Sequence, residues 1–247
     1  MLWKKITGRY QRSAARRFAQ RLCEMRTGRP FISFTFDDFP RSALLVAGKL
    51  LESYGVRATY YASLGLAGQR APTGEIFYEN DIASLLERGH ELGCHTFSHC
   101  HAFETAPARF EASILENARD LQRIAPGATF ETLSYPIGSP RPETKRRAAR
   151  YFSACRGGGQ TYNHGRFDLN LVAGFFLEQS RDNLKTIYQT IDAACRDGGW
   201  LIFATHDVSD DPTRYGCTPS FFEEVLNYSA KSGAEILPVS QALRLIQ

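Results

Sequence analysis

The sequence predicts an α/β fold in which helices cover a parallel β-sheet. Short apolar runs alternate with longer segments of helical periodicity from Phe31 to the end of the chain. At 247 residues, the chain has a usual length for one barrel of alternating strands and helices. We find no internal repeat and no convincing interdomain linker. We therefore expect a single catalytic domain over residues 30–247, whose sheet is either closed as a barrel or open and doubly wound.

The strands and helices are expected in alternation along this domain. Phe31–Phe36 is a β-rich run, and Arg41–Tyr54 has a helical face that Gly55 terminates. Further strands are predicted at Ala58–Ala62, Glu91–His95, Thr132–Tyr135, Phe152–Cys155, Ala173–Leu177, Leu201–Thr205 and Glu235–Leu237. Further helices are predicted at Asn80–Arg88, Pro107–Ile124, Pro142–Tyr151, Arg181–Arg196 and Pro219–Lys231.

Residues 1–29 form a basic segment that precedes this domain. They contain nine Lys or Arg residues and one acidic residue, Glu24. Apolar residues recur at spacings of three and four from Trp3 to Met25, which predicts a basic amphipathic helix. Such a helix could pack on its own barrel, could attach residues 1–26 to an anionic membrane surface, or could be a transit peptide. A nucleic-acid partner is not expected, because the basic residues are confined to this segment.

The cysteines and the apolar segments indicate the compartment. The six cysteines show no Cys-x-x-Cys pair and no recurring spacing, which argues against a zinc finger or a disulfide framework: Cys23, Cys94, Cys100, Cys155, Cys195 and Cys217. The sequence has no apolar stretch long enough to span a membrane and no signal-peptide core. We expect a cytoplasmic protein, with the inner face of the membrane as the alternative location if the basic segment binds lipid.

Ionisable residues follow three of the predicted strands. Asp37 and Asp38 end the first strand, His95 ends the third, and His206 follows Leu201–Thr205. In parallel α/β folds, reactive residues gather at the carboxyl ends of the strands, so these side chains should meet at one rim.

These residues suit a metal site. Two adjacent carboxylates after an apolar strand repel each other and need a cation, although they could also cap the next helix. His95 and His99 are four residues apart, a spacing that lets two imidazoles reach one ion. Together with one Asp, they form a three-ligand site with room for water, which is typical of catalytic zinc and also suits non-haem iron.

The motifs that carry these residues resemble those of the polysaccharide deacetylase family, which is also called carbohydrate esterase family 4 or the NodB-homology domain. The similar segments are Thr35–Asp38, His95–His99 and Leu201–Asp207, with Ala204 where the family usually has leucine. The resemblance covers residues 30–247 and implies a distorted (β/α) barrel.

The resemblance also implies roles for individual residues. Asp37 would be the general base, and His206 the general acid. Asp38, His95 and His99 would bind a divalent metal, zinc before cobalt, nickel or iron. Tyr135, Pro136 and Ile137 would contact the substrate, and the backbone N–H of Ile137 could donate to the oxyanion.

Two parts of the family pattern are missing from this sequence. Ser134 stands where the family's third motif has an Arg that pairs with the base, and the Asp-Trp segment that tunes the acid histidine is not recognisable. The candidate substitutes are Arg141, Arg166, Asp168 and Glu178. His164 lies in a predicted rim loop and could contact substrate. The Gly157–Gly159 run could approach a phosphate, but it lacks the spacing of a nucleotide-binding loop and is more typical of a plain turn.

We therefore expect metal-dependent removal of an N-acetyl or N-formyl group from a sugar in a glycan, a lipid-linked saccharide or a nucleotide-linked saccharide. One alternative is a metal-dependent amidohydrolase of a small amide that is not a sugar. The other is a catalytically silent carbohydrate-binding protein, which the two missing motifs suggest.

Overall fold

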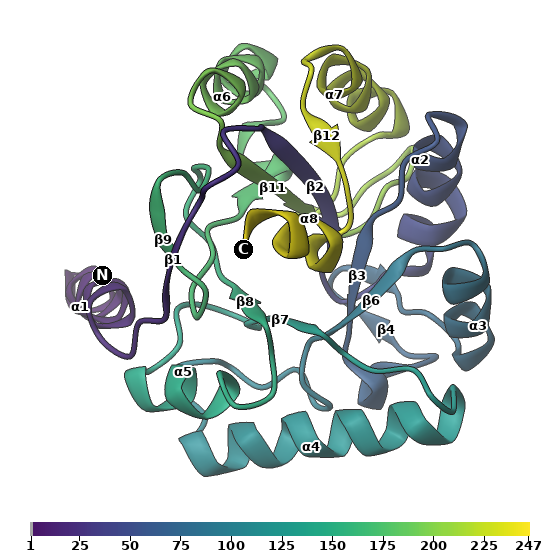
Figure 1. Ribbon diagram of the computed structural model, residues 1–247. Coiled ribbons are helices and arrows are strands. Elements are labelled where there is room, and N and C mark those ends of the chain that lie inside the picture. The colour runs from purple at the N-terminus through teal and green to yellow at the C-terminus, as the bar shows by residue number, and fades with distance from the viewer. Residues whose placement is uncertain (1) are drawn as a thin grey trace.

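The computed structural model describes residues 2–247, with side chains from Tyr10 onward. A curled parallel sheet forms its centre (Figure 1). Seven strands follow the order β10-β11-β2-β3-β6-β7-β8, and β12 pairs with β2. Their bounds are Phe175–Phe176 (β10), Trp200–Thr205 (β11), Phe31–Phe36 (β2), Thr59–Ala62 (β3), Glu91–Cys94 (β6), Thr132–Ser134 (β7), Ala154–Arg156 (β8) and Glu235–Ile236 (β12). Because β8 and β10 form the two edges, the sheet is an incomplete barrel, which confirms the predicted distorted (β/α) fold.

Helices pack around the outside of this sheet, as predicted (Figure 1). They are α2 (Lys49–Ser53), α3 (Glu79–Glu87), α4 (Pro107–Ile124), α5 (Pro142–Ala148), α6 (Leu184–Arg196) and α7 (Pro219–Lys231). Every residue of β2 is buried, because the strand is covered on both faces. Aromatic side chains fill much of the core around it, and Phe36 stacks on Tyr60 with ring centroids 4.7 Å apart. The alternation of apolar runs in the sequence thus reports a sheet with two buried faces.

Two helical segments differ from the expectation. The helix predicted at Arg41–Tyr54 begins as a π-helix over Ala43–Gly48 and becomes α-helical only in α2. Helix α8 (Val239–Ile246) was not predicted, and its apolar side chains cover Phe31 and Trp200 at the amino ends of β2 and β11. Helix α8 therefore closes the end of the barrel opposite the rim where the ionisable residues lie.

The N-terminal segment is attached to the domain. Helix α1 spans Leu2–Arg17, and Leu22–Glu24 (β1) then pairs antiparallel with Arg166–Asp168 (β9), so the prediction of one helix reaching Met25 was wrong. The fully buried Lys145 of α5 donates from Nζ to the carbonyl oxygens of Ala15 at 2.6 Å and Phe18 at 2.9 Å, and contacts Asp168 at 2.6 Å. A lysine at this point satisfies carbonyls that the end of α1 leaves without partners. The end of the basic segment is thereby fixed on the barrel.

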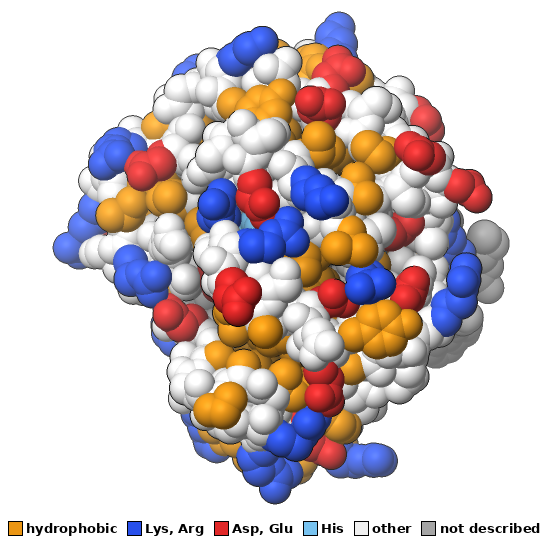
Figure 2. Space-filling view, turned by 90° about the vertical axis from the view of Figure 1, so that its right-hand side faces the viewer, with side chains coloured by type: hydrophobic (Ala, Val, Ile, Leu, Met, Phe, Trp, Pro, Cys, Tyr) orange, Lys and Arg blue, Asp and Glu red, His pale blue; other side chains and the backbone are white. Residues whose placement is uncertain are grey.

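The surface over α2 and α3 carries interspersed acidic, basic and hydrophobic side chains (Figure 2). Across residues 2–247, the search for a helix both long and apolar enough to cross a bilayer finds none. All six cysteines are free thiols, as the sequence predicted.

Candidate metal and catalytic site

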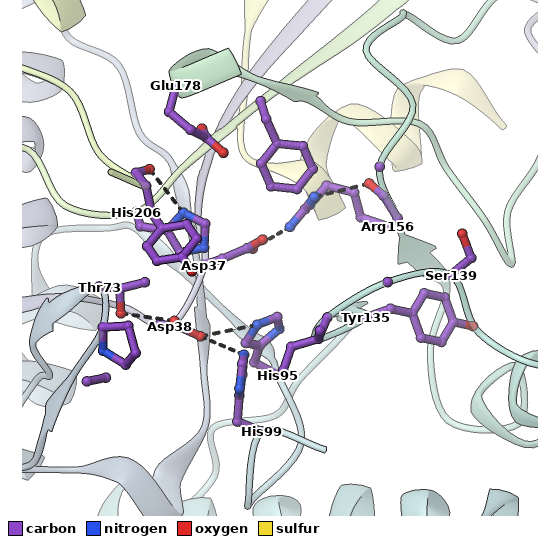
Figure 3. Close-up of a pocket in the computed structure, with 18 of the residues that line it drawn as sticks. Asp37, Asp38, Thr73, His95, His99, Tyr135, Ser139, Arg156, Glu178 and His206 are labelled. Carbon is purple, nitrogen blue, oxygen red and sulfur yellow. Dashed lines mark hydrogen bonds and ion pairs between the residues drawn. The ribbon is translucent and has the colours of Figure 1, made fainter. Parts of the chain in front are cut away.

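Turns at the ends of the strands place the ionisable side chains at one rim. Asp38 and Phe39 follow β2 with φ angles of 60° and 51°, and Thr96 and His99 follow β6 with φ angles of 61° and 49°. Non-glycine residues rarely adopt positive φ, and such strain is concentrated at functional sites. These turns bring the two segments together, and Figure 3 shows Asp38, His95 and His99 converging.

Asp38, His95 and His99 form a cluster that could hold a metal ion. One ligand atom from each lies within 4.8 Å of the others. Nε2 of His99 and Nε2 of His95 are 3.0 and 3.4 Å from Oδ1 of Asp38. Thr73, which sequence reasoning missed, donates to the other oxygen of Asp38 at 3.0 Å.

The protonation of this cluster fits a bound cation. Nδ1 of His95 lies 2.8 Å from the carbonyl oxygen of Ser134, so Nδ1 carries the hydrogen and a neutral ring has its lone pair on Nε2. That lone pair faces Oδ1 of Asp38, which is buried and accepts no hydrogen bond from the part of the chain whose side chains the structure describes. A carboxylate oxygen and two imidazole nitrogens directed at one point are the donors of a catalytic zinc site.

Asp37 lies beside this cluster and is paired with a buried arginine. Nη2 of Arg156 donates to Oδ1 of Asp37 (Figure 3). The same Nη2 also donates to Oγ of Ser134 at 2.5 Å. Burial by itself would raise the pKa of Asp37, but the charge of Arg156 and its hydrogen bond to the carboxylate lower it. Asp37 is therefore held as a carboxylate next to the candidate metal ligands.

Arg156 supplies the group that the sequence seemed to lack, and none of the four proposed substitutes pairs with Asp37. It is the last residue of β8 and the register partner of Ser134 in β7. The guanidinium also lies 5.4 Å from the ring centroid of Tyr61 and 5.3 Å from that of Phe176. Tyr61 can occupy its place because Gly93 lacks a side chain, since a Cβ there would be 2.4 Å from the Tyr61 ring.

Three of the proposed substitutes have other roles. Arg141 donates to the Phe103 carbonyl, Asp168 pairs with Lys145, and Arg166 lies on the exposed side of β9. Arg141 and Arg166 therefore do not pair with the base, and Asp168 does not pair with the acid histidine.

Glu178, the fourth proposed substitute, does point into the site (Figure 3). Burial raises its pKa to about 7, and the nearby charge of Asp37 also raises it. Its Oε2 is buried without a hydrogen-bond partner among the described residues. A buried carboxyl group without a partner is costly, so a ligand hydroxyl or amide would be a favourable neighbour.

His206 follows β11 on the other side of Asp37. Its Nδ1 lies 3.2 Å from the Tyr215 carbonyl oxygen, which makes Nδ1 the donor and leaves Nε2 available for proton exchange. The ring also packs against Phe176 with centroids 6.4 Å apart. His206 thus faces the same cavity as Asp37 with a fixed orientation.

The segment after β7 contributes less than expected. Tyr135 and Ile137 line the cavity, whereas Pro136 is not among the lining residues. The Tyr135 hydroxyl donates to the Asn170 carbonyl at 3.2 Å, away from the metal ligands. Ile137 has a φ of 43°, and within the described chain its N–H donates to no protein group, so it remains available to a ligand.

These residues surround one cavity of about 1180 Å³. Its lining includes His95, His99, Arg156 and His206 besides Asp37 and Asp38. Gly157–Gly159 also line it, whereas His164 does not. His90 is structural, because it accepts from the Ala58 N–H at 3.1 Å and pairs with Glu52.

The chain belongs to the polysaccharide deacetylase family. The family model described as "Polysaccharide deacetylase" matches residues 24–153, more than half of the chain. A search of curated proteins finds no match.

Solved structures of this family share the fold. A family 4 acetyl xylan esterase from Clostridium thermocellum, in complex with a cobalt ion, is 20% identical with a TM-score of 0.57, covering 87% of this chain and 91% of the esterase. Peptidoglycan deacetylase PdaC from Bacillus subtilis is 18% identical with a TM-score of 0.57, covering 88% and 91%. A carbohydrate esterase family 4 pseudoenzyme from Bacillus anthracis is 10% identical with a TM-score of 0.62, covering 90% and 68%. At these identities, the likeness supports the fold alone.

Proposed function

We propose that this protein is a metal-dependent carbohydrate N-deacylase that hydrolyses an N-acetyl or N-formyl group on a sugar. The observation that carries the proposal is the site itself, where a three-residue ligand cluster, an ionised base and a histidine acid line one cavity. Asp38, His95 and His99 would hold a divalent cation, with zinc favoured by their donor atoms. Such a cation, when bound, polarises the acyl carbonyl and lowers the pKa of a water molecule.

The protein side chains carry the proton transfers. Asp37 accepts a proton from the attacking water, and Arg156 keeps Asp37 ionised and oriented for this step. The water oxygen bonds to the carbonyl carbon, and the N–H of Ile137 donates to the carbonyl oxygen as it gains negative charge. His206 then protonates the amide nitrogen through Nε2 as the C–N bond breaks. The products are a carboxylate and a free amino sugar.

The size and lining of the cavity favour a saccharide over a small amide. About 1180 Å³ exceeds the usual range of roughly 300–1000 Å³ for small-molecule sites. The unpartnered carboxyl oxygen of Glu178 can bind a sugar hydroxyl. A catalytically silent binding protein would gain nothing from holding Asp37 ionised beside the ligand cluster.

The membrane hypothesis for residues 1–26 receives less support. Ala14 and Ala15 of α1 are buried, and Leu22–Glu24 is paired in a sheet, so the segment is already engaged with the barrel. A cytoplasmic location remains a prediction.

The test is release of acetate or formate from a panel of N-acylated sugars by the full-length protein with added zinc. We expect release from at least one sugar, and a fall of at least about 100-fold in kcat for Asp37→Asn, the scale of general-base catalysis. Tyr10→Phe, on exposed α1, is the matched control and should retain activity. Full activity of Asp37→Asn would refute the assignment of the base.

A further inference from the structure

The cavity extends beyond the catalytic residues to the N-terminal helix. Gln11, Arg12 and Arg16 of α1 line it together with Asp37 and His206. Arg12 and Arg16 are exposed and four residues apart, so they lie on one face of the helix. Arg17 is also exposed but does not line the cavity. Nothing in the proposed deacylation uses these arginines.

The helix is held at the cavity by contacts that do not involve its arginine side chains. Ala14 and Ala15 are buried, and Lys145 donates to the Ala15 carbonyl at 2.6 Å. Within residues 10–247, no ion pair includes Arg12 or Arg16. Two guanidinium groups without acidic partners therefore stand at the wall of a cavity that contains a candidate reaction centre.

The loop after β8 adds further donors to the same cavity. Gly157–Gly159 line it, and the N–H groups of Gly158 and Gly159 donate to no described protein group. A side chain at Gly157 would collide with Leu171, because a Cβ there would lie 2.7 Å from Cδ1. Glycines leave the backbone of this loop accessible to a ligand, as in other sites where main-chain amides contact phosphate.

We propose that Arg12 and Arg16, with the amides of Gly158 and Gly159, bind a phosphate or diphosphate group of the N-acylated saccharide. This inference rests on the proposed function and names the class of its substrate. Two guanidinium forks and two amides match a group with several anionic oxygens, whereas a single carboxylate is satisfied by one arginine. The acidic residues that line the cavity do not pair with these arginines. Asp37 is paired with Arg156, Asp38 belongs to the ligand cluster, and Glu178 forms no ion pair among the described residues.

The experiment compares binding of a charged and a neutral sugar to the zinc-loaded, full-length protein. Isothermal titration calorimetry with N-acetylglucosamine 1-phosphate and with methyl N-acetylglucosaminide measures the preference for phosphate. We expect the wild type to bind the phosphorylated sugar at least about tenfold more tightly, since a charge-assisted hydrogen bond is worth about 1.5 kcal/mol or more. Arg12→Ala/Arg16→Ala should reduce the preference to below about twofold. Arg17→Ala removes one arginine from the same helix but outside the cavity, and should preserve the preference.

Three results would overturn the phosphate site. The first is equal binding of the two sugars to the wild type, and the second is no binding of the phosphorylated sugar. The third is an unchanged preference in Arg12→Ala/Arg16→Ala, which would place the phosphate on the metal.

Acetate release separates failure of the phosphate site from failure of the proposed function. If only the phosphate site is wrong, the wild type still releases acetate from a neutral sugar. If deacylation is wrong, no sugar releases acetate, although the phosphorylated sugar still binds through the arginines.

Two substrate types share this chemistry, and further titrations distinguish them. Uridine diphosphate N-acetylglucosamine represents nucleotide-linked saccharides, and geranyl diphosphate N-acetylglucosamine represents lipid-linked ones. If the wild type binds one of these two sugars more tightly, and Arg12→Ala/Arg16→Ala loses that tighter binding, the preferred sugar identifies the source of the phosphate. If the double variant binds both diphosphate sugars as tightly as the wild type does, the proposed site is wrong.

Discussion

Exchanging the residues at positions 134 and 156 would move the guanidinium that pairs with Asp37 from β8 to β7. Ser134 and Arg156 are register partners in adjacent parallel strands, which lie about 4.8 Å apart. We expect Arg156→Ser to disable the protein and Ser134→Arg/Arg156→Ser to restore part of its function. The double variant places arginine at position 134, where the resemblance described above implies one.

The structure indicates the size of the effect. Arg156 and Asp37 are 2% and 4% exposed, so Arg156→Ser leaves a buried carboxylate without its partner. Breaking a buried pair in this way costs about 3–5 kcal/mol. For a domain of this length, that cost lowers Tm by roughly 10 °C. The pKa of Asp37 also rises, because burial is no longer opposed by Arg156, so the acidic limb of the activity profile moves to higher pH.

The assay combines thermal unfolding by circular dichroism with kcat as a function of pH on a sugar that the wild type deacylates. We expect kcat of Arg156→Ser to fall by at least about 100-fold, and the double variant to recover at least tenfold of this loss. Asp37→Asn/Arg156→Ser completes a double-mutant cycle and should cost less stability than the two single changes added together.

Two results would refute this reasoning. The first is an Arg156→Ser variant with the activity and Tm of the wild type. The second is a double-mutant cycle with no coupling between positions 37 and 156, since the model of a buried pair requires it.

Three further predictions concern other parts of the structure. Because burial raises the pKa of Glu178 from its ordinary 4.5 to about 7, the folded state binds the proton more tightly, so stability falls as pH rises between these values. Glu178→Gln should remove this loss, up to about 3 kcal/mol at pH 8, in urea unfolding at pH 5 and 8; equal pH dependence in both proteins would contradict it. Lys145→Met should expose α1 to protease cleavage and lower stability by about 3–5 kcal/mol by leaving Asp168 without its cation, whereas an unchanged digestion pattern would mean that α1 docks by other contacts. Removing metal with a chelator should abolish deacylation and lower Tm, and added zinc should restore both. The Tm of His99→Ala should respond neither to the chelator nor to zinc. A wild type whose activity and Tm are insensitive to the chelator would exclude a metal at this site.

The sheet and the residues at its rim could be predicted because both depend on local sequence. Apolar runs identify buried strands, and the ends of parallel strands share one edge, so Asp37, His95 and His206 could be placed together before their distances were known. Helix α8 was missed although it has a well-defined apolar face, because its eight residues are fewer than the roughly 11–18 over which helical periodicity is read.

Arg156 was missed for a different reason. The predicted strand ended at Cys155, one residue early, and a boundary error of this size is usual for strands. Which side chain pairs with Asp37 also depends on the register between β7 and β8, which no local pattern encodes. The place of α1 could not be inferred either, because it depends on Lys145, more than a hundred residues away in the chain.

The attachment of the N-terminal segment changes where this enzyme can be divided. A boundary at residue 30 separates the basic segment from the motif-bearing domain in sequence, but trimming there would remove the strand that pairs with β9. It would also leave the buried ammonium group of Lys145 without the Ala15 and Phe18 carbonyls and open one wall of the cavity. The smallest unit that keeps the site enclosed therefore begins before the motifs that carry Asp37, His95 and His206, within a helix that contains none of them.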